Sequence, residues 1–171
     1  PTPEDNPTTE AKVELGKKLY FDPRISSTGT VSCNTCHNVM EGGDDGRRTS
    51  MGVHGETGPR NAPTVWNAAF LSVQFWDGRA DTLEDQAAGP IINPVEMGMP
   101  DHEFTAERIN GIKGYCEEFK EVFGSEEVNI DRMTKAIGAY ERTLLTPDTP
   151  YNNYVNGDEG AMTDKQLRGM E

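Results

Sequence analysis

The sequence is short of cysteine, of long apolar runs and of basic residues. Three cysteines among 171 residues are too few for a disulfide framework. No apolar stretch approaches the roughly 20 residues of a membrane-spanning helix, which argues against a membrane span. Sixteen basic residues against 29 acidic ones give a formal charge of −13, which argues against nucleic-acid binding and favours a partner with a positive face. A single domain of ordinary size, large enough to bury a core, fits these limits.

Two of the cysteines belong to one short motif, Cys33-Asn34-Thr35-Cys36-His37. C-x-x-C-H is the attachment signature of c-type haem, in which both thiols become thioethers and the adjacent imidazole ligates the iron as the proximal base. A zinc half-site or a thioredoxin-like redox pair would need only C-x-x-C. Zinc would also require two further ligands, and a redox pair has no use for the histidine. The motif occurs once, so the sequence predicts one covalent haem c.

The third cysteine, Cys116, is then left without a partner. It lies one step off the apolar face of a helical stretch that contains Tyr115 and Phe119. Two interpretations stay open for it: a small, partly buried filler of the core, or a thiol with an intermolecular or redox role.

Hydrophobic periodicity predicts a mainly α fold with long loops. The glycine-rich stretch 41–58 has no apolar period and is expected to be a functional loop, and the methionine-rich stretch 91–100 is expected to be non-helical. The expected helices are one that ends before Asp22-Pro23, a short one over 61–70, one opened by an Asp81–Glu84 capping box and stopped by Gly89-Pro90, one that ends at Gly124, and one that carries the apolar stripe from Ile130 to Leu144.

The two ends of the chain are expected to differ from this body. Three prolines among polar neighbours predict a flexible, solvated arm over residues 1–8. Residues 9–162 then form the haem domain. Thr163 and Gln166 make a second capping box, so 163–171 is expected to be the start of a truncated helix that leads to an absent second domain. Because haem is attached covalently outside the cytoplasm, we expect a removed leader and a periplasmic protein.

Seven short motifs, in this order along the chain, resemble those of the bacterial di-haem cytochrome c peroxidases. They are GKKLYFDPR at 16–24, SCNTCHN at 32–38, RNAPT at 60–64, QFWDGRA at 74–80, QAAGP at 86–90, NPVEM at 93–97 and ERTL at 141–144. The resemblance is to the N-terminal, peroxidatic half of that family. It implies a cytochrome c-like haem domain that reduces hydrogen peroxide, and a second haem domain that this chain lacks.

The resemblance also implies roles for three polar residues on the distal side of the haem. His54 corresponds to the histidine that caps the iron in the resting state and then swings away, although an isolated loop histidine is also often just solvated. Glu96 corresponds to the acid–base group that moves a proton between the peroxide oxygens, and Gln86 to an amide that orients the peroxide. From the residues alone, both would equally be ordinary surface side chains.

Other implied roles concern the contact with the missing half. Trp76 corresponds to a tryptophan between the two haems that assists electron transfer, although beside Phe75 it would also suit a core. Asn61 corresponds to a residue of a calcium site between the halves, which would be incomplete here. Met97 and Met99 are expected to pack rather than to ligate iron. His102 matches no motif and is expected at the surface.

The sequence therefore predicts a periplasmic peroxidase domain that takes electrons from a small redox protein of the cytochrome or cupredoxin type. A single-haem chain is expected to turn over poorly. A non-enzymatic electron carrier and a haem oxidase that modifies a protein substrate are the alternatives; related oxidases carry a distal tyrosine, and a histidine in the corresponding loop argues against that reading. The sequence leaves open whether the chain forms a homodimer.

Overall fold

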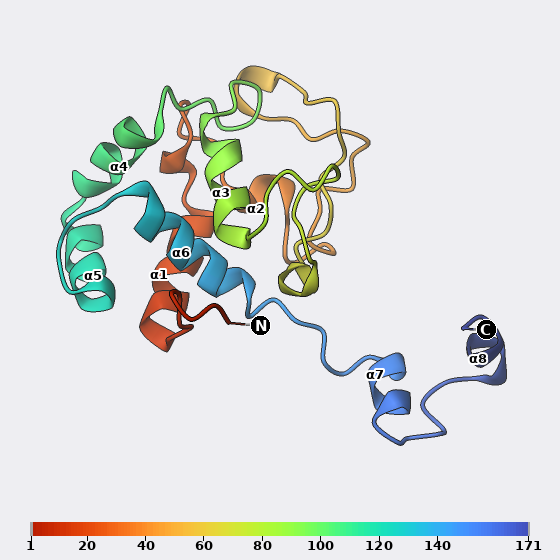
Figure 1. Ribbon diagram of the computed structural model, residues 1–171. Helices are drawn as coiled ribbons and strands as arrows, with labels where there is room; N and C mark the ends of the chain where they lie inside the picture. The colour runs from red at the N-terminus through yellow and green to blue at the C-terminus, as the bar shows by residue number, and fades with distance from the viewer. Residues whose placement is uncertain (1, 171) are drawn as a thin grey trace.

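The protein, described over residues 2–170 by a computed structural model, consists of short helices joined by long loops (Figure 1). Isolated antiparallel bridges replace strands in the described part of the chain. None of the helices described there is both long and apolar enough to span a membrane. The helices are α1 Glu10–Phe21, α2 Cys33–Cys36, α3 Leu83–Ile92, α4 His102–Asn110, α5 Lys113–Phe123, α6 Ile130–Glu141, α7 Pro150–Val155 and α8 Asp164–Arg168, with the 3-10 turns η1 Pro23–Ile25, η2 Val53–Gly55 and η3 Ala68–Phe70.

The core forms where α1 crosses α6. Gly16 permits this crossing, because a Cβ built on it would lie 1.8 Å from the carbonyl oxygen of Ala136. Leu15, Leu19 and Ile137 are buried around the contact. Tyr20 and Tyr140 meet edge to face, with ring centroids 5.1 Å apart. The predicted mainly α class is confirmed, and the two helices with the clearest apolar stripes supply the central contact.

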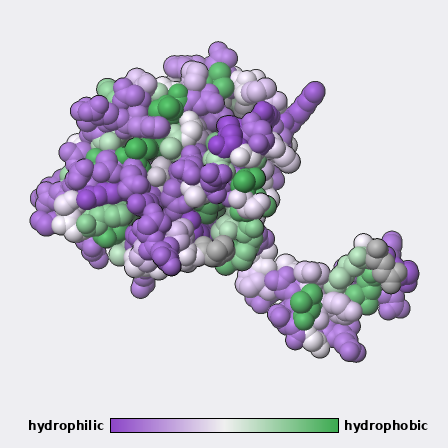
Figure 2. All heavy atoms as spheres, in the orientation of Figure 1, coloured by the Kyte–Doolittle hydropathy of each residue, from purple (hydrophilic) through white to green (hydrophobic). Residues whose placement is uncertain are grey.

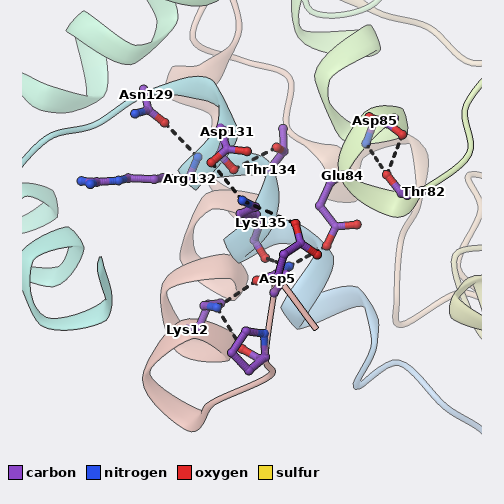
Figure 3. A network of polar contacts seen from close by, with 12 residues as sticks. Asp5, Lys12, Thr82, Glu84, Asp85, Asn129, Asp131, Arg132, Thr134 and Lys135 are labelled. Carbon is purple, nitrogen blue, oxygen red and sulfur yellow. Dashed lines mark hydrogen bonds and ion pairs between the residues drawn. The ribbon is translucent and has the colours of Figure 1, made fainter. Parts of the chain in front are cut away.

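The N-terminal segment is tied to this crossing through Asn6. Figure 3 labels the neighbouring Asp5 together with Lys12, Glu84 and Lys135. Although its neighbours are exposed, as expected for 1–8, the Asn6 side chain is only 1% exposed. It donates to the carboxylate of Glu84 on α3 and to the Lys135 carbonyl on α6, and it accepts from the buried ammonium of Lys12 at 2.9 Å. A buried amide with three partners fixes this segment, so the expectation of a wholly solvated arm was wrong at this residue.

Several helix boundaries differ from expectation for local reasons. Thr82, not Asp81, caps α3, because its side chain accepts from the Asp85 amide. The helix continues through Pro90 to Ile92, since a proline in the last turn removes only one intrahelical bond. The expected helix over 61–70 shrinks to η3, which follows a left-handed residue, Asn67, with φ of 61°.

The C-terminal half also contains more helices than expected. The stretch before Gly124 is divided into α4 and α5, and α7 was not predicted. Gly124 ends α5 with φ of 81°, and the Thr163–Gln166 capping box opens α8, as predicted. In Figure 1, α7 and α8 lie beyond the end of α6, apart from the other helices. Hydrophilic side chains cover most of the face of the body drawn in Figure 2.

Three loops are each closed at the base by an isolated bridge. Asn38 pairs with Asp44, Met51 with Thr57, and Gln74 with Ala80. The second loop carries His54 and the third carries Trp76. The long stretch between α2 and α3 is therefore a series of short closed loops, and each of these two residues lies near the tip of one.

Candidate functional site

The C-x-x-C-H motif forms a single helical turn, α2. The Ser32 amide donates to the Thr35 hydroxyl at 2.9 Å, and the His37 amide donates to the Cys33 carbonyl at 3.0 Å. Burial raises the pKa of both the Cys33 and the Cys36 thiol. Neither sulfur is in a disulfide. Both thiols therefore lie free on one helical turn, as two thioether bonds to one edge of the porphyrin require.

The imidazole of His37 is already oriented for ligation. Its Nδ1 lies 2.9 Å from the carbonyl oxygen of Pro63, which can only accept, so Nδ1 carries the proton and Nε2 keeps its lone pair. Burial lowers the pKa of the ring, which favours the neutral form that binds metals. The Tyr20 hydroxyl donates to the His37 carbonyl at 2.7 Å and fixes the backbone. Two free thiols and a neutral imidazole with a fixed tautomer fit a covalent haem c.

The loop of His54 is packed against the segment of Glu96. The Val53 amide donates to the Glu96 carbonyl at 2.9 Å. Gly52 is required at this contact, because a Cβ there would lie 2.1 Å from the Val95 carbonyl oxygen. His54 itself has a left-handed backbone, with φ of 59°, and an exposed side chain. The structure therefore joins the two predicted distal elements through their backbones, and it leaves the His54 ring free of the core.

Glu96 has the electrostatic character of an acid–base group. Burial raises the pKa of its carboxyl, and the guanidinium of Arg79 partly offsets the effect. The negative charge of Glu96 in turn contributes to the raised pKa of Cys36. The carboxyl therefore lies within electrostatic reach of the haem attachment site. A carboxyl whose pKa moves toward neutrality is better able both to accept and to return a proton.

Gln86 lies on α3, whose last turn holds the Glu96 segment in place. The Met97 amide donates to the Pro90 carbonyl oxygen at 3.2 Å, and the Met99 amide donates to the Ile91 carbonyl oxygen at 2.9 Å. Both methionine side chains are buried in the hydrophobic core, which agrees with a packing role. The Gln86 side chain is half-buried. The elements that carry Gln86 and Glu96 are thus directly bonded to one another.

Trp76 is 66% exposed, so the idea that it fills the core was wrong. Its indole N–H donates to the backbone carbonyl of Asn61 at 2.9 Å. The Asn61 side-chain amide donates to the Arg47 carbonyl at 2.6 Å, which leaves its Oδ1 available. Among residues 2–170, His, Cys, Asp and Glu form no group of three that could hold a metal ion. A calcium ion at Asn61 would therefore rely on amide and carbonyl oxygens.

His102 and Cys116, which lie outside the site, both form hydrogen bonds that involve α4. His102 is half-buried, not fully at the surface, and its Nε2 donates to the Ala88 carbonyl at 2.9 Å, which ties α4 to α3. The Cys116 thiol lies 3.0 Å from the Asn110 carbonyl oxygen, with which it can form a hydrogen bond at the α4–α5 junction. Cys116 is half-buried and in no disulfide, which is compatible with both interpretations.

Sequence reasoning missed two residues near the site. Arg79 stacks on the Phe75 ring, 3.4 Å from its centroid, donates to Asp77, and acts on Glu96. Arg79 belongs to the QFWDGRA motif at 74–80, but the sequence predicted no role for it. Glu141 is buried at the end of α6. The available signal was a glutamate four residues after Ile137, on the apolar stripe of that helix.

Comparison with known proteins identifies the family. The family model for di-haem cytochrome c peroxidase matches residues 10–160. The chain is 48% identical over 163 residues to Cytochrome c551 peroxidase of Nitrosomonas europaea, covering 95% of this chain and 48% of that protein. It is 42% identical over 171 residues to Methylamine utilization protein MauG of Methylorubrum extorquens, covering 99% and 48%. The chain belongs to the di-haem cytochrome c peroxidase family.

The structural comparison agrees. The crystal structure of a MauG-like protein associated with microbial copper homeostasis has a TM-score of 0.88 to this chain, at 32% identity, over 99% of this chain and 50% of that one. This match confirms the predicted fold class. The chain spans about half the length of the relatives that it matches.

Proposed function

We propose that the chain is the peroxidatic half of a di-haem cytochrome c peroxidase and that it reduces hydrogen peroxide to water. The haem would be held by Cys33, Cys36 and His37. When bound, it supplies the redox chemistry and an iron position at which peroxide can be accepted. The observation that carries the proposal is the half-buried Glu96 carboxyl, whose pKa is raised and whose charge acts on Cys36.

In this proposal Glu96 handles the proton. Cleaving the O–O bond of peroxide heterolytically needs a group that takes a proton from one oxygen and returns it to the departing one. A carboxyl with a pKa raised toward neutrality suits both halves of that transfer. Gln86 would orient the peroxide through an amide hydrogen bond without competing for the proton. Arg79 limits the rise in the pKa of Glu96, so the carboxylate form remains accessible.

His54 would act as the cap on the distal side of the site. Its ring is exposed, and glycines flank the Val53–His54 pair. The positive φ of His54 is a conformation that non-glycine residues adopt only at a cost of about 1 kcal/mol or more. A cap that moves aside requires such a locally strained, solvent-facing loop rather than a packed element.

The test is a Glu96→Gln variant of the haem-loaded chain, mixed rapidly with peroxide. The amide keeps the size of the side chain and removes its acid–base function, so the peroxide step is expected to slow by ~100-fold or more. Glu56→Gln is the matched control, because Glu56 is exposed at the far end of the His54 turn. It should react at the wild-type rate. Equal rates for the two variants would exclude Glu96 as the proton-transfer group.

A haem oxidase that acts on a protein substrate is the second candidate, since one relative is a MauG protein at 42% identity. In our proposal the distal ligand is His54, whereas a tyrosine would favour the oxidase. A non-enzymatic carrier would keep both axial positions filled. Spectra of the oxidised and reduced protein distinguish it from a peroxidase, because only the peroxidase forms a high-spin state with an open position.

The proposal extends to the setting of the protein. Covalent haem attachment favours the periplasm, and the acidic charge favours a donor with a positive face, such as a small cytochrome or cupredoxin. Trp76, exposed at a loop tip, is proposed as part of the electron path to a second haem domain. Calcium at Asn61 is proposed to stabilise the contact between the two halves, and its removal by a chelator should weaken their association.

A further inference from the structure

Glu141 is a carboxylic acid enclosed in the protein interior. It is the last residue of α6 and is 6% exposed. Its Oε2 is buried and has no hydrogen-bond partner among the residues that the structure describes. Because an unpaired buried carboxylate is costly, such a group is expected to bind a proton rather than to stay charged.

The arginine beside Glu141 is already engaged with another carboxylate. Arg142 binds Glu84 through two bonds, with Nη1 at 2.7 Å from Oε1 and Nη2 at 3.0 Å from Oε2. Asn6 donates a further hydrogen bond to Glu84, and Glu84 and Lys12 appear with the N-terminal segment in Figure 3. These bonds hold the pKa of Glu84 below its usual range. The guanidinium is therefore hydrogen-bonded to Glu84, and its charge only partly offsets the rise in the pKa of Glu141.

The titratable groups coupled electrostatically to Glu141 come from four helices and from the residue that follows α6. Cys33 lies on α2, Tyr20 on α1, Glu84 on α3 and Tyr140 on α6, and Arg142 follows the last residue of α6. Burial is the main cause of the raised pKa of the Cys33 thiol and of Tyr20, and a negative charge on Glu141 raises both further. Once Cys33 forms a thioether it carries no charge. The remaining variable charge near Glu141 is then that of the haem, attached at Cys33.

We propose that Glu141 is the redox-linked proton site of this domain and binds a proton more tightly once the haem iron has accepted an electron. The electron comes from the donor protein, or from a mediator in the experiment, and converts ferric to ferrous iron. The proton comes from water and binds the Glu141 carboxylate, and no covalent bond to carbon breaks. The loss of one positive charge at the iron favours protonation of the nearby buried acid.

The size of this coupling follows from charge separation in a protein interior. Two unit charges about 10 Å apart at an effective dielectric constant of about 20 change a proton affinity by roughly tenfold. Burial and the charge of Glu84 raise the pKa of Glu141 to about 8. The titration therefore falls in a range that a folded protein tolerates. The inference rests on haem attachment at Cys33 and Cys36 and does not depend on peroxidase activity.

The test is a potentiometric titration of the haem-loaded chain between about pH 5.5 and 9.5, followed by its visible spectrum. A tenfold difference in proton affinity between the two oxidation states lowers the midpoint potential by about 59 mV in total as the pH rises through the window. Glu141→Gln is expected to abolish this dependence. Glu14→Gln is the matched control, because Glu14 is exposed on α1 and the substitution likewise replaces a carboxyl by an amide. This variant should keep the wild-type dependence of the midpoint potential on pH.

A second measurement uses the wild-type protein and so does not depend on the folding of any variant. The infrared difference spectrum between reduced and oxidised protein, recorded near pH 8, should show a carboxylic-acid C=O band that appears on reduction and shifts in heavy water. Absence of that band would overturn the proposal. So would a pH dependence that survives in Glu141→Gln, which would assign the proton to Glu96, His54 or the acid groups of the haem.

Discussion

Replacing Gly16 with alanine provides a direct test of how this fold is held together. The added Cβ would lie 1.8 Å from the carbonyl oxygen of Ala136 and 2.4 Å from its carbonyl carbon. Both atoms belong to the backbone of α6, so no side-chain rotation can relieve the clash. The two helices must therefore separate by about 1 Å or more, and a gap of that size forfeits a quarter to a half of each dispersion contact across the crossing.

The free energy of unfolding lost through the clash can be compared with the gain from the higher helix propensity of alanine. Overpacking a core costs about 1–3 kcal/mol, and a clash with backbone belongs at the upper end of that range. Alanine recovers about 1 kcal/mol through its better helix propensity. The net destabilisation should be about 2 kcal/mol, because Leu15, Leu19 and Tyr20 lie along the same contact. That is a large fraction of the stability of an ordinary domain.

The assay is urea unfolding of the haem-loaded protein, followed by far-ultraviolet circular dichroism. Gly114→Ala is the matched control, since Gly114 lies in α5 and a Cβ there would meet nothing within 4 Å. It should leave the midpoint unchanged or raise it slightly. If Gly16→Ala unfolds at or above the wild-type urea midpoint, the close approach of α1 and α6 is not what the packing of this core requires.

Three further outcomes are expected. Replacing both Cys33 and Cys36 with alanine should abolish covalent haem, as measured by the mass of the denatured protein; an unmodified mass for wild-type protein matured in a haem-competent periplasm would refute the attachment site. His54→Gly should convert a low-spin oxidised haem to high spin in its electron paramagnetic resonance spectrum, and an unchanged spectrum would remove His54 from the iron. The unfolding free energy of the haem-loaded protein should fall between about pH 4.5 and pH 8, because the pKa of Glu141 is about 8 in the folded state against 4.5 when unfolded. Since the folded state binds the extra proton, the contribution of Glu141 to stability is fully present below that window and is lost as the pH rises through it, and Glu141→Gln should flatten this part of the curve.

The sequence predicted the parts of the fold that depend on local signals. The helices of the central crossing carry apolar residues at helical spacing, and the Thr163–Gln166 capping box and the left-handed Gly124 are visible in the residue types themselves. The division of 102–123 into α4 and α5 did have a local signal, because Gly111 after Asn110 caps the end of α4, but this signal was not used in predicting the helices. The helix expected over 61–70 shrinks to η3 after Asn67, which has a left-handed backbone and hydrogen-bonds to Thr146, 79 residues away.

In the candidate site, too, some features follow from the local sequence and others depend on tertiary structure. The proposed haem ligand and attachment cysteines rest on a motif whose spacing follows from the chemistry. The Pro63 carbonyl that sets the tautomer of His37 could not be predicted in this way, because a contact over 26 residues depends on tertiary structure. The effect of Arg79 on the pKa of Glu96 likewise depends on tertiary structure. Residue types predict which chemistry is possible, and only the fold shows which charges act on it.

The two carboxyls proposed to bind protons, Glu96 and Glu141, differ in their surroundings in a way that suits their different proposed roles. Both are buried enough for desolvation to raise their pKa, but Glu96 acts on Cys36 and Glu141 on Cys33. Arg79 reaches only the first and Arg142 only the second. Glu96 also lies on a loop segment bonded to the His54 turn, whereas Glu141 lies within the packed end of α6. A proton needed for chemistry on a substrate must reach solvent and substrate, so it belongs on the loop. A proton that only compensates the charge of the iron needs no such path, and a buried helix end can hold it.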